Sequence, residues 1–169
     1  GSAPPAAAPV SEPEAKRKSH TASVCVLPFV NMSGDPEQEY FSDGISEDII
    51  TDLTKVSSLA VVSRNTAFHF KGKSVEVGHV AKQLKVSHVV EGSVRKAGGR
   101  VRITAQLIDA AKDNQVWAER YDRDLNDIFA LQDEISEAIV KALKLKLLPE
   151  EKKAIEQRGT DNVDAYNLY

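Results

Sequence analysis

The chain has 169 residues, the size of one ordinary domain with some additional sequence. Its net charge of −3 and 41% hydrophobic content give no sign of a basic nucleic-acid-binding chain or a long acidic tail. Its longest apolar runs stop well short of the ~20 residues that a membrane-spanning helix needs. The single cysteine excludes an intramolecular disulfide and a metal site built from several cysteines.

Residues 1–22 are expected to form a linker. Alanine and proline alternate between Ala3 and Pro9, and a charged stretch follows, so the segment offers almost nothing that a core could bury. The short basic run at 16–18 is interpreted as a solvated patch, with the flank of a membrane segment outside the chain as the alternative. We therefore expect this segment to be extended and mobile.

The segment 23–59 carries the strongest structural signal. Its β-branched apolar run at 24–30 is typical of a strand buried on both faces, and turn-forming residues follow at 31–36. Asp35 and Pro36 suit the first positions of a helix. Apolar residues then recur with the spacing of one helix face, at Ile45, Ile49, Ile50, Leu53 and Val56. Such a stripe is buried against a sheet, so the segment predicts a strand–loop–helix unit.

The rest of the chain ends in consecutive strands. The residues at 97–99 join two strand patterns and are typical of a hairpin turn. Further strands are expected at 59–62, 88–96, 100–109 and 115–121, and helices are expected after the capping residues Ser74 and Asp127. The last helix should bury an apolar stripe, which consists of Leu131, Ile135, Ile139, Ala142 and Leu143. The resulting order, β-α-β-α-β-β-β-α, predicts an α/β (α+β-like) fold with a mixed five-stranded sheet flanked by helices.

Several stretches along this frame resemble the amino-terminal domain of TolB and its relatives. They are 26–31, 40–49, 63–65, 91–95, 101–107 and 117–122, in the family's order, within residues 23–148. Relatives tend to carry glycine just after the leucine that ends the second helix. Lys85 occupies that place here, which leaves open the left-handed helix cap that glycine would supply.

Domains of this kind occur within multidomain bacterial class III adenylate cyclases, between the cyclase and a run of tetratricopeptide repeats. The resemblance therefore implies a TolB amino-terminal-like α/β domain at 23–148 that belongs to an adenylate or guanylate cyclase. Residues 149–169 are expected to form a helical connector and the truncated start of the repeats, because the sequence at 165–169 resembles the opening of a tetratricopeptide helix.

The sequence contains no recognisable catalytic or cofactor-binding motif. It lacks a phosphate-binding glycine loop, a dinucleotide fingerprint and a Gly-x-Ser-x-Gly sequence. The carboxylates at 43–52 are interpreted as a helix cap and a solvated helix face, and the histidines at 69, 79 and 88 lack the spacing of metal ligands. We therefore expect no catalytic residue, metal or cofactor here, and the resemblance places cyclase chemistry in a catalytic domain outside this chain.

The first candidate site is a ligand edge. In open α/β sheets, ligands bind beyond the carboxyl ends of parallel strands, and the loops after the first two strands supply that edge here. The candidate ligand edge consists of Asn31, Met32, Ser33, Asp43, Arg64, Asn65, Thr66 and Phe68. The alternative for these residues is loop-to-loop bracing, in which Asn and Ser side chains satisfy turn backbone.

The second candidate site is the open face of the later strands. At 101–107, apolar residues alternate with polar ones that point outward, which indicates a strand with one solvated face. The candidate protein-binding face consists of Arg102, Thr104 and Gln106, with Trp117, Glu119 and Tyr121 beside them. The alternative for Trp117 is packing beneath the final helix.

These observations favour a non-catalytic binding or signal-relay module of a larger signalling protein, an adenylate cyclase. Its expected partners are the cyclase domain and the tetratricopeptide repeats of the same chain, and other proteins. Nucleic acid is not expected, and a membrane is reached only through a segment outside the chain. The compartment is the cytoplasm or, if a membrane helix precedes the linker, the periplasm.

Two alternative functions stay open. One is a small-ligand sensor that uses the strand-end edge, and the other is a cell-envelope assembly module, as TolB kinship suggests. A pocket of several hundred Å³ at the edge would favour the sensor, whereas filled loops and an apolar patch would favour the relay module.

Overall fold

The computed structural model describes residues 22–148. Residues 1–21 of the predicted linker and the predicted connector at 149–169 lie outside the described part of the chain. The elements, in chain order, are β1 (Ala22–Val26), β2 (Val30–Asn31), α2 (Pro36–Thr54), β3 (Leu59–Val61), α3 (Arg64–Phe68), α4 (Val77–Leu84), β4 (His88–Ala97), β5 (Arg100–Asp109), β6 (Asn114–Asp124) and α5 (Ile128–Leu147). None of the helices in 22–148 combines the length and the apolar character that a membrane crossing requires.

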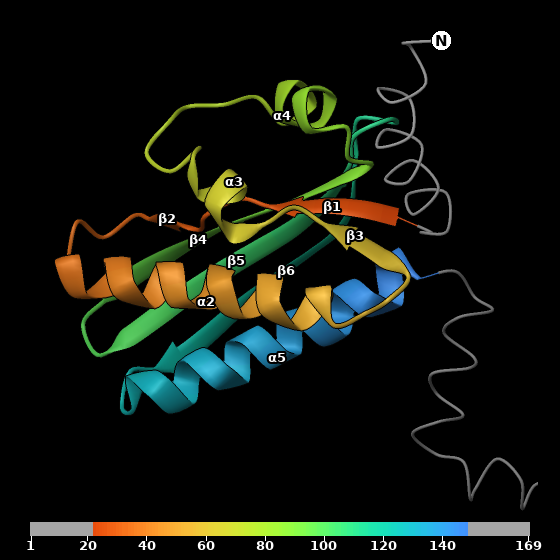
Figure 1. Ribbon diagram of the computed structural model, residues 1–169. Helices are drawn as coiled ribbons and strands as arrows, with labels where there is room; N and C mark the ends of the chain where they lie inside the picture. Colours follow the sequence, from red (N-terminus) through yellow and green to blue (C-terminus); the bar gives the residue numbers. More distant parts are fainter. Residues whose placement is uncertain (1–21, 149–169) are drawn as a thin grey trace, which may run out of the picture.

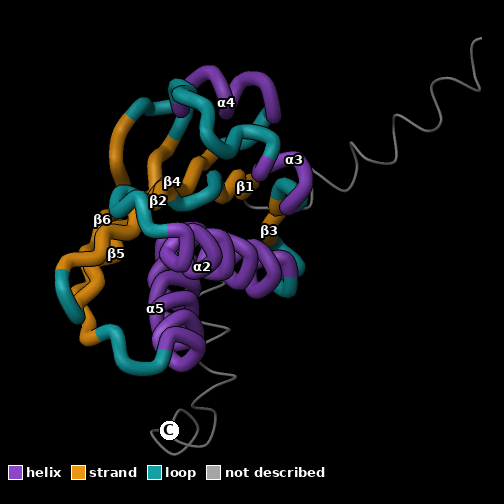
Figure 2. Tube along the Cα trace, turned by 90° about the vertical axis from the view of Figure 1, so that its left-hand side faces the viewer, coloured by secondary structure: helices purple, strands orange, loops and turns teal. Residues whose placement is uncertain are grey.

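The helices pack around a mixed sheet. The strand order is β3-β1-β4-β5-β6, and β2 pairs with β4. β1 is parallel to β3 and β4, whereas β4, β5 and β6 form an antiparallel meander. Figure 1 shows α2 and α5 side by side in front of the sheet, and Figure 2 shows α4 on its opposite side and α3 beside the edge strand β3. The predicted α/β fold class is therefore confirmed.

The sheet has a sixth strand because the first predicted strand is divided. Pro28 has no backbone N–H to donate to a ladder, and the strand is interrupted there. Between β1 and β2 the chain advances one residue more than β4 does beside it, so this segment bulges. The bulge buries Phe29, whose N–H donates a hydrogen bond to Ser46 Oγ at 2.9 Å.

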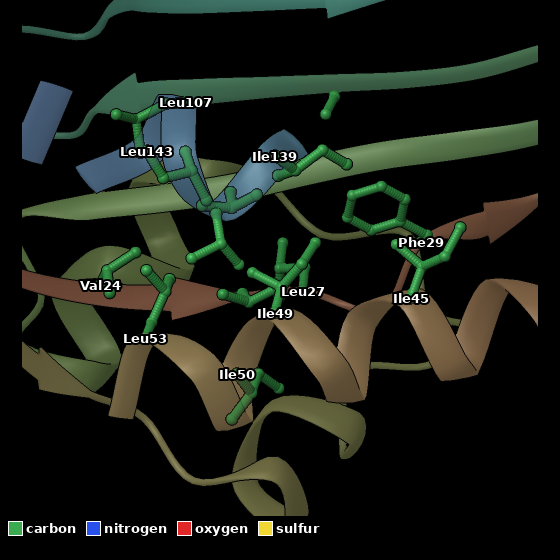
Figure 3. Packing of buried hydrophobic residues seen from close by; sticks show 14 of the residues in the cluster. Val24, Leu27, Phe29, Ile45, Ile49, Ile50, Leu53, Leu107, Ile139 and Leu143 are labelled. Atoms are coloured by element: carbon green, nitrogen blue, oxygen red, sulfur yellow. The ribbon is translucent and has the colours of Figure 1, made fainter. Parts of the chain in front are cut away.

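The main core lies between the sheet and the helices α2 and α5. The predicted stripe of α2 is fully buried at Ile45, Ile49 and Leu53. Figure 3 shows these side chains between α2 and the strand that carries Val24. Helix α5 meets them with its own predicted stripe, of which Ile139 has no exposed surface. Both amphipathic helices therefore bury the faces that their sequences indicated.

The helix ends agree with most of the predicted caps. The Asp35 and Asp127 side chains accept hydrogen bonds from the first turns of α2 and α5. The predicted start of the second helix at Ser74 is wrong, because α4 begins at Val77 and the chain before it stays extended. Helix α4 ends at Lys85, which has a left-handed backbone with φ of 58°. A lysine therefore supplies the conformation that glycine would adopt more easily.

Candidate functional site

A strap crosses the first half of α2 and closes one side of the candidate site. The strap, residues 64–76, comprises α3 and the chain that leads to α4. Lys71 Nζ lies 3.0 Å from Glu39 Oε2 and also donates a hydrogen bond to Asp43 Oδ2. Arg64 Nη2 lies 2.9 Å from Glu47 Oε2. Because the three carboxylates recur every four residues, they form a row on one face of α2 that holds the strap.

The ion pairs of the strap have an electrostatic consequence on α2. The hydrogen bond from Lys71 holds the pKa of Glu39 below its ordinary value, against the opposing effect of burial. The Arg64 guanidinium also stacks on Phe68, with 4.3 Å between its central carbon and the ring centroid. Three residues of the predicted ligand edge therefore take part in holding the strap, namely Asp43, Arg64 and Phe68.

The remaining residues of the predicted ligand edge are mostly engaged in local bracing. Asn31 Nδ2 donates to the Asp35 carbonyl at 2.8 Å, and Asn31 Oδ1 accepts from the Ser33 N–H at 3.0 Å. Ser33 Oγ accepts from the Lys96 N–H at 2.6 Å. Thr66 hydrogen-bonds the Ser63 side chain that caps α3. The bracing interpretation therefore describes Asn31, Ser33 and Thr66.

Four of the eight predicted edge residues, Met32, Arg64, Asn65 and Thr66, are exposed, and the eight do not line one pocket. Met32 has 52% of its surface exposed, and Asn65 is exposed on α3. A hollow of about 550 Å³ does lie at this edge, between the β1–β2 bulge, Glu39 and the strap. We call it the strap hollow. Of the eight predicted residues only Asn31 lines it, together with strap residues such as Lys71 and Lys73.

A second hollow, of about 540 Å³, lies on the open face of the meander. We call it the open-face hollow, and it spans β4, β5 and β6. Its lining includes the predicted residues Thr104 and Gln106 as well as Ser93, whose Oγ lies 2.6 Å from Thr104 Oγ1. Glu91 and Gly92 line both hollows, so the two adjoin at this point of β4.

Glu91 is the carboxylate that both hollows share. Burial raises its pKa, and a hydrogen bond from Gln106 Nε2 at 3.4 Å only partly opposes that effect. Within residues 22–148, no lysine or arginine forms an ion pair with it. A half-buried carboxylate of this kind favours a cation or a hydrogen-bond donor from outside. Glu91 was not predicted as a site residue, although a carboxylate among the valines of 89–94 was a usable signal.

The register of the meander divides the predicted protein-binding face between two sides of the sheet. Residues directly opposite each other in antiparallel strands share a face. Trp117, Glu119 and Tyr121 lie opposite the buried residues Leu107, Ala105 and Ile103. Their Cβ atoms therefore share the helix-covered side and point away from Arg102, Thr104 and Gln106, although the exposed Glu119 on this edge strand also lines the open-face hollow. The expectation of one six-residue face is wrong.

The two aromatic residues of that prediction belong to the core side. Tyr121 is buried, with 9% of its surface exposed. Trp117 is partly buried and packs against the core, as the alternative for this residue foresaw. On the open side, Arg102 pairs with Asp122 at 2.7 Å, and its cross-strand neighbour Arg95 is exposed. The open face is thus polar and carries arginines.

The metal-ligating side chains and the single cysteine of the described residues are placed as follows. Between residues 22 and 148, no three His, Cys, Asp or Glu side chains gather in a way that could hold a metal ion. Cys25 is fully buried in β1, and burial raises the pKa of its thiol to about 11. A thiol of this kind stays protonated at neutral pH and is a poor nucleophile. Asp48 hydrogen-bonds Gln132 of α5 and serves helix packing.

Residues 19–138 match the family model for the second domain of HilA/YgeH-like transcriptional regulators. The chain belongs to this family. The HilA/YgeH-like domain is also 56% identical over 146 residues to "Putative adenylate cyclase 3" of Rhizobium meliloti (strain 1021). That match takes in 86% of this chain but 25% of the relative, so the chain spans about a quarter of the curated relative's length.

Two solved structures share the fold of this HilA/YgeH-like domain. Lipoprotein GNA1162 from Neisseria meningitidis aligns with a TM-score of 0.53 and 17% identity, over 72% of this chain and 97% of that one. TolB from Acinetobacter baumannii aligns with a TM-score of 0.50 and 18% identity, over 72% of this chain and 28% of that one. Identities this low show the fold alone, and the expected TolB-like fold is present.

Proposed function

We propose that this HilA/YgeH-like domain is a non-catalytic binding and signal-relay module of a larger adenylate cyclase. The proposal rests on one observation: the chain matches sequences from two different classes of protein. The family model describes a domain of transcriptional regulators, whereas the curated relative is named as an adenylate cyclase. Two proteins with such different outputs share this domain, so its contribution is one that both can use, namely binding and relay.

The partners in this proposal are other segments of the same protein. The catalytic domain, of class III, supplies the cyclase chemistry, and tetratricopeptide repeats follow the module. The relative is about four times as long as the matched segment, which leaves room for both. Relay then requires that the module contact a neighbouring segment through a surface that the fold leaves free.

The open face of the meander is the surface we assign to this contact. It is uncovered beside Thr104 and Gln106, which line the open-face hollow. Arg95 and Arg102 lie opposite each other at one end of it, and of these two Arg102 is paired with Asp122. Arg95 is exposed and forms no ion pair with another described residue, so it is available to an acidic partner surface.

An exchange of segments tests this proposal. The matched segment of the Rhizobium meliloti relative is deleted, or replaced by the corresponding segment of this chain, and cyclic AMP formation is measured. We expect deletion to change the output of the relative and the exchange to restore it. Arg95→Glu in the exchanged segment should prevent that restoration. The variant should fold, because it places a carboxylate opposite Arg102 in place of a like charge.

Lys82→Glu is the matched control, since it reverses one exposed charge on α4 rather than on the meander. Equal restoration by the wild-type and Arg95→Glu segments would remove the open face from the proposal. Formation of cyclic AMP by the present chain alone would overturn the non-catalytic assignment.

Small-ligand sensing is a second candidate, and the strap hollow supports it. The hollow's volume of about 550 Å³ is within the range of small-molecule sites, and Glu91 offers a carboxylate that lacks a cation in the described chain. A set of small amines, assayed by thermal shift, tests this function. Stabilisation of the wild type that disappears in Glu91→Gln would support it. Cell-envelope assembly rests only on likeness to lipoprotein GNA1162 and TolB, and at identities of 17% and 18% that likeness concerns the fold alone.

A further inference from the structure

Strand β6 is an open edge of the sheet. In the described part of the chain it pairs with β5 alone, and most of its residues are exposed. An open edge presents a row of backbone N–H and C=O groups that another strand can bind. A register shift beside Leu107 leaves Val116 unpaired, so the regular edge runs from 117 to 124.

The free backbone groups of this edge belong to even-numbered residues. The two-residue turn at 98–99 makes Ala97 and Arg100 a hydrogen-bonded pair, so even-numbered residues of β5 bond to β4 and odd-numbered ones bond to β6. By the β5–β6 register, odd-numbered residues of β6 bond back to β5. The backbone groups left facing outward are those of Ala118, Arg120, Asp122 and Asp124.

Side chains of the same strand occupy two of these outward groups. Glu119 Oε1 accepts a hydrogen bond from the Arg120 N–H at 3.1 Å. Arg123 Nη1 donates one to the Asp122 carbonyl at 3.0 Å. Each contact joins neighbouring residues, so a strand that offers both a carbonyl and an N–H can replace them.

The charged residues on either side of Tyr121 are arranged so that two copies of the strand, related by a two-fold axis, would place opposite charges together. Glu119 and Arg120 precede Tyr121, and Asp122 and Arg123 follow it. If a second strand of the same sequence runs antiparallel with the two tyrosines opposed, Arg120 faces Asp122 on one side of the sheet. Glu119 then faces Arg123 on the other side. We propose that β6 pairs with β6 of a second copy of this chain, about a two-fold axis at Tyr121.

The backbone of this arrangement agrees with its charges. Arg120 and Asp122 of opposite copies form a hydrogen-bonded pair, because the backbone groups of both residues face outward. The Arg120 N–H then leaves Glu119 of its own copy and donates to the Asp122 carbonyl of the second copy. Glu119, released in this way, faces Arg123 across the axis, and Arg123 can donate to it through Nη1 while its Nε keeps the 2.7 Å contact with Glu134 of its own copy.

No neighbouring register is as favourable. Centring the axis on Glu119, Arg120, Asp122 or Arg123 would bring that charged residue opposite its own copy, which is repulsive. Tyr121 also lies midway between Ala118 and Asp124, the outermost of the outward-facing residues. Charged residues on an edge strand often serve only to prevent association. That role would not require the alternation of acidic and basic residues around Tyr121.

Sedimentation velocity of the full chain tests the proposal. The contact is short, so we expect a weak dimer, with a Kd of about 10–1,000 μM, when the concentration is raised to several hundred μM. Higher salt should weaken the dimer, because exposed charge pairs are screened. Arg120→Glu should raise the Kd about tenfold or more, since it opposes Asp122 with a like charge.

A charge swap identifies the register. Arg120→Glu alone and Asp122→Lys alone should each associate at least about tenfold more weakly than the wild type, because like charges then meet across the axis in either homodimer. An equimolar mixture should regain the wild-type association, because both cross-axis pairs have opposite charges again. Lys112→Glu, in the exposed turn before β6, makes the same change in net charge as Arg120→Glu and should leave the Kd unchanged.

Ala118→Pro provides a variant that does not depend on charge. It removes an outward N–H, which the ladder with β5 does not use, and should abolish association while circular dichroism and the melting temperature stay close to the wild type. A wild type that remains monomeric throughout the concentration range would overturn the proposal. Association that survives both Arg120→Glu and Ala118→Pro, or a mixture of charge variants that associates no more tightly than either variant alone, would overturn it equally.

Discussion

Gly92 lies directly against the aromatic ring of Phe29. A Cβ added at Gly92 would lie 2.3 Å from Phe29 Cε2, much closer than real Cβ contacts allow. The bulge after β1 brings the ring over β4 at this point, and both residues also line the strap hollow. The absence of a side chain at Gly92 therefore allows the bulge to close on the sheet.

Gly92→Ala should destabilise the fold by about 1–3 kcal/mol, because the rigid ring of Phe29 would have to move within a packed core. Gly44→Ala is the matched control. The atoms nearest its new Cβ are the end of the flexible Gln132 side chain, so the cost is limited to the hydrogen bond from Gln132 to Asp48, and alanine favours a helix by about 1 kcal/mol over glycine. Urea unfolding measures both. Similar free energies of unfolding for the two variants would contradict this explanation.

Leu53→Ala should destabilise the fold by about 2–5 kcal/mol, because Leu53 is fully buried between α2 and the sheet and its removal leaves a cavity. Leu145→Ala, at a leucine of α5 that is 43% exposed, should change the free energy of unfolding by less than about 0.5 kcal/mol. Denaturant unfolding of the two variants measures the difference. A Leu53→Ala effect as small as that of Leu145→Ala would show that the stripe of α2 does not carry the core.

Hydrophobic spacing was sufficient to predict the layers of this fold. The stripes containing Ile49 and Ile139 identified two helices that bury one face each, and the alternation in 101–107 identified a strand with one solvated side. Both patterns depend on residues within one element. The division of the first strand was not predicted, although Pro28 was a sequence signal for it; the bulge that packs Phe29 against Gly92 depends on contacts across the sheet.

The candidate site was harder to predict because it depends on register between strands. A shift of one residue moves every side chain of a strand to the other face, so the placement of Tyr121 required knowledge of its partner Ile103. Glu91 was missed for a similar reason. Its sequence neighbours do not show that two hollows meet beside it or that no cation lies next to it in the described chain.

Lys71→Met should release the strap from α2 while the rest of the fold persists. The variant leaves Glu39 and Asp43 without the ammonium group that bridges them. Because the ion pairs are partly exposed, we expect a loss of only about 0–1 kcal/mol in global stability. Amide hydrogen exchange should accelerate locally, at the Lys71 and Lys73 N–H groups that form the turns of the strap.

Lys73→Met is the control for this measurement, because Lys73 lines the same hollow but forms no ion pair with a carboxylate of 22–148. It should leave exchange in the strap close to the wild-type rate. Equal acceleration by the two variants would mean that the row of carboxylates on α2 does not hold the strap.

Glu91→Gln should stabilise the protein at neutral pH. Burial raises the folded-state pKa of Glu91 above its ordinary value of 4.5, so the ionised carboxylate is less favourable in the folded chain than in the unfolded one. Above the folded pKa this cost is fully present. As the pH falls through the folded pKa and then below 4.5, the carboxyl group becomes protonated in both states, and the cost disappears. The glutamine keeps a carbonyl oxygen for the hydrogen bond from Gln106.

Urea unfolding of the wild type and Glu91→Gln between pH 3 and pH 7 should therefore give curves that coincide at the acidic end. They should separate toward neutral pH, with the variant more stable. Glu137→Gln removes an exposed carboxylate of α5 and controls for the loss of one negative charge. A wild type that is more stable than Glu91→Gln at pH 7 would mean that the ionised carboxylate has a favourable partner within the protein. Glu91 would then not offer an unpaired carboxylate to a ligand in either hollow.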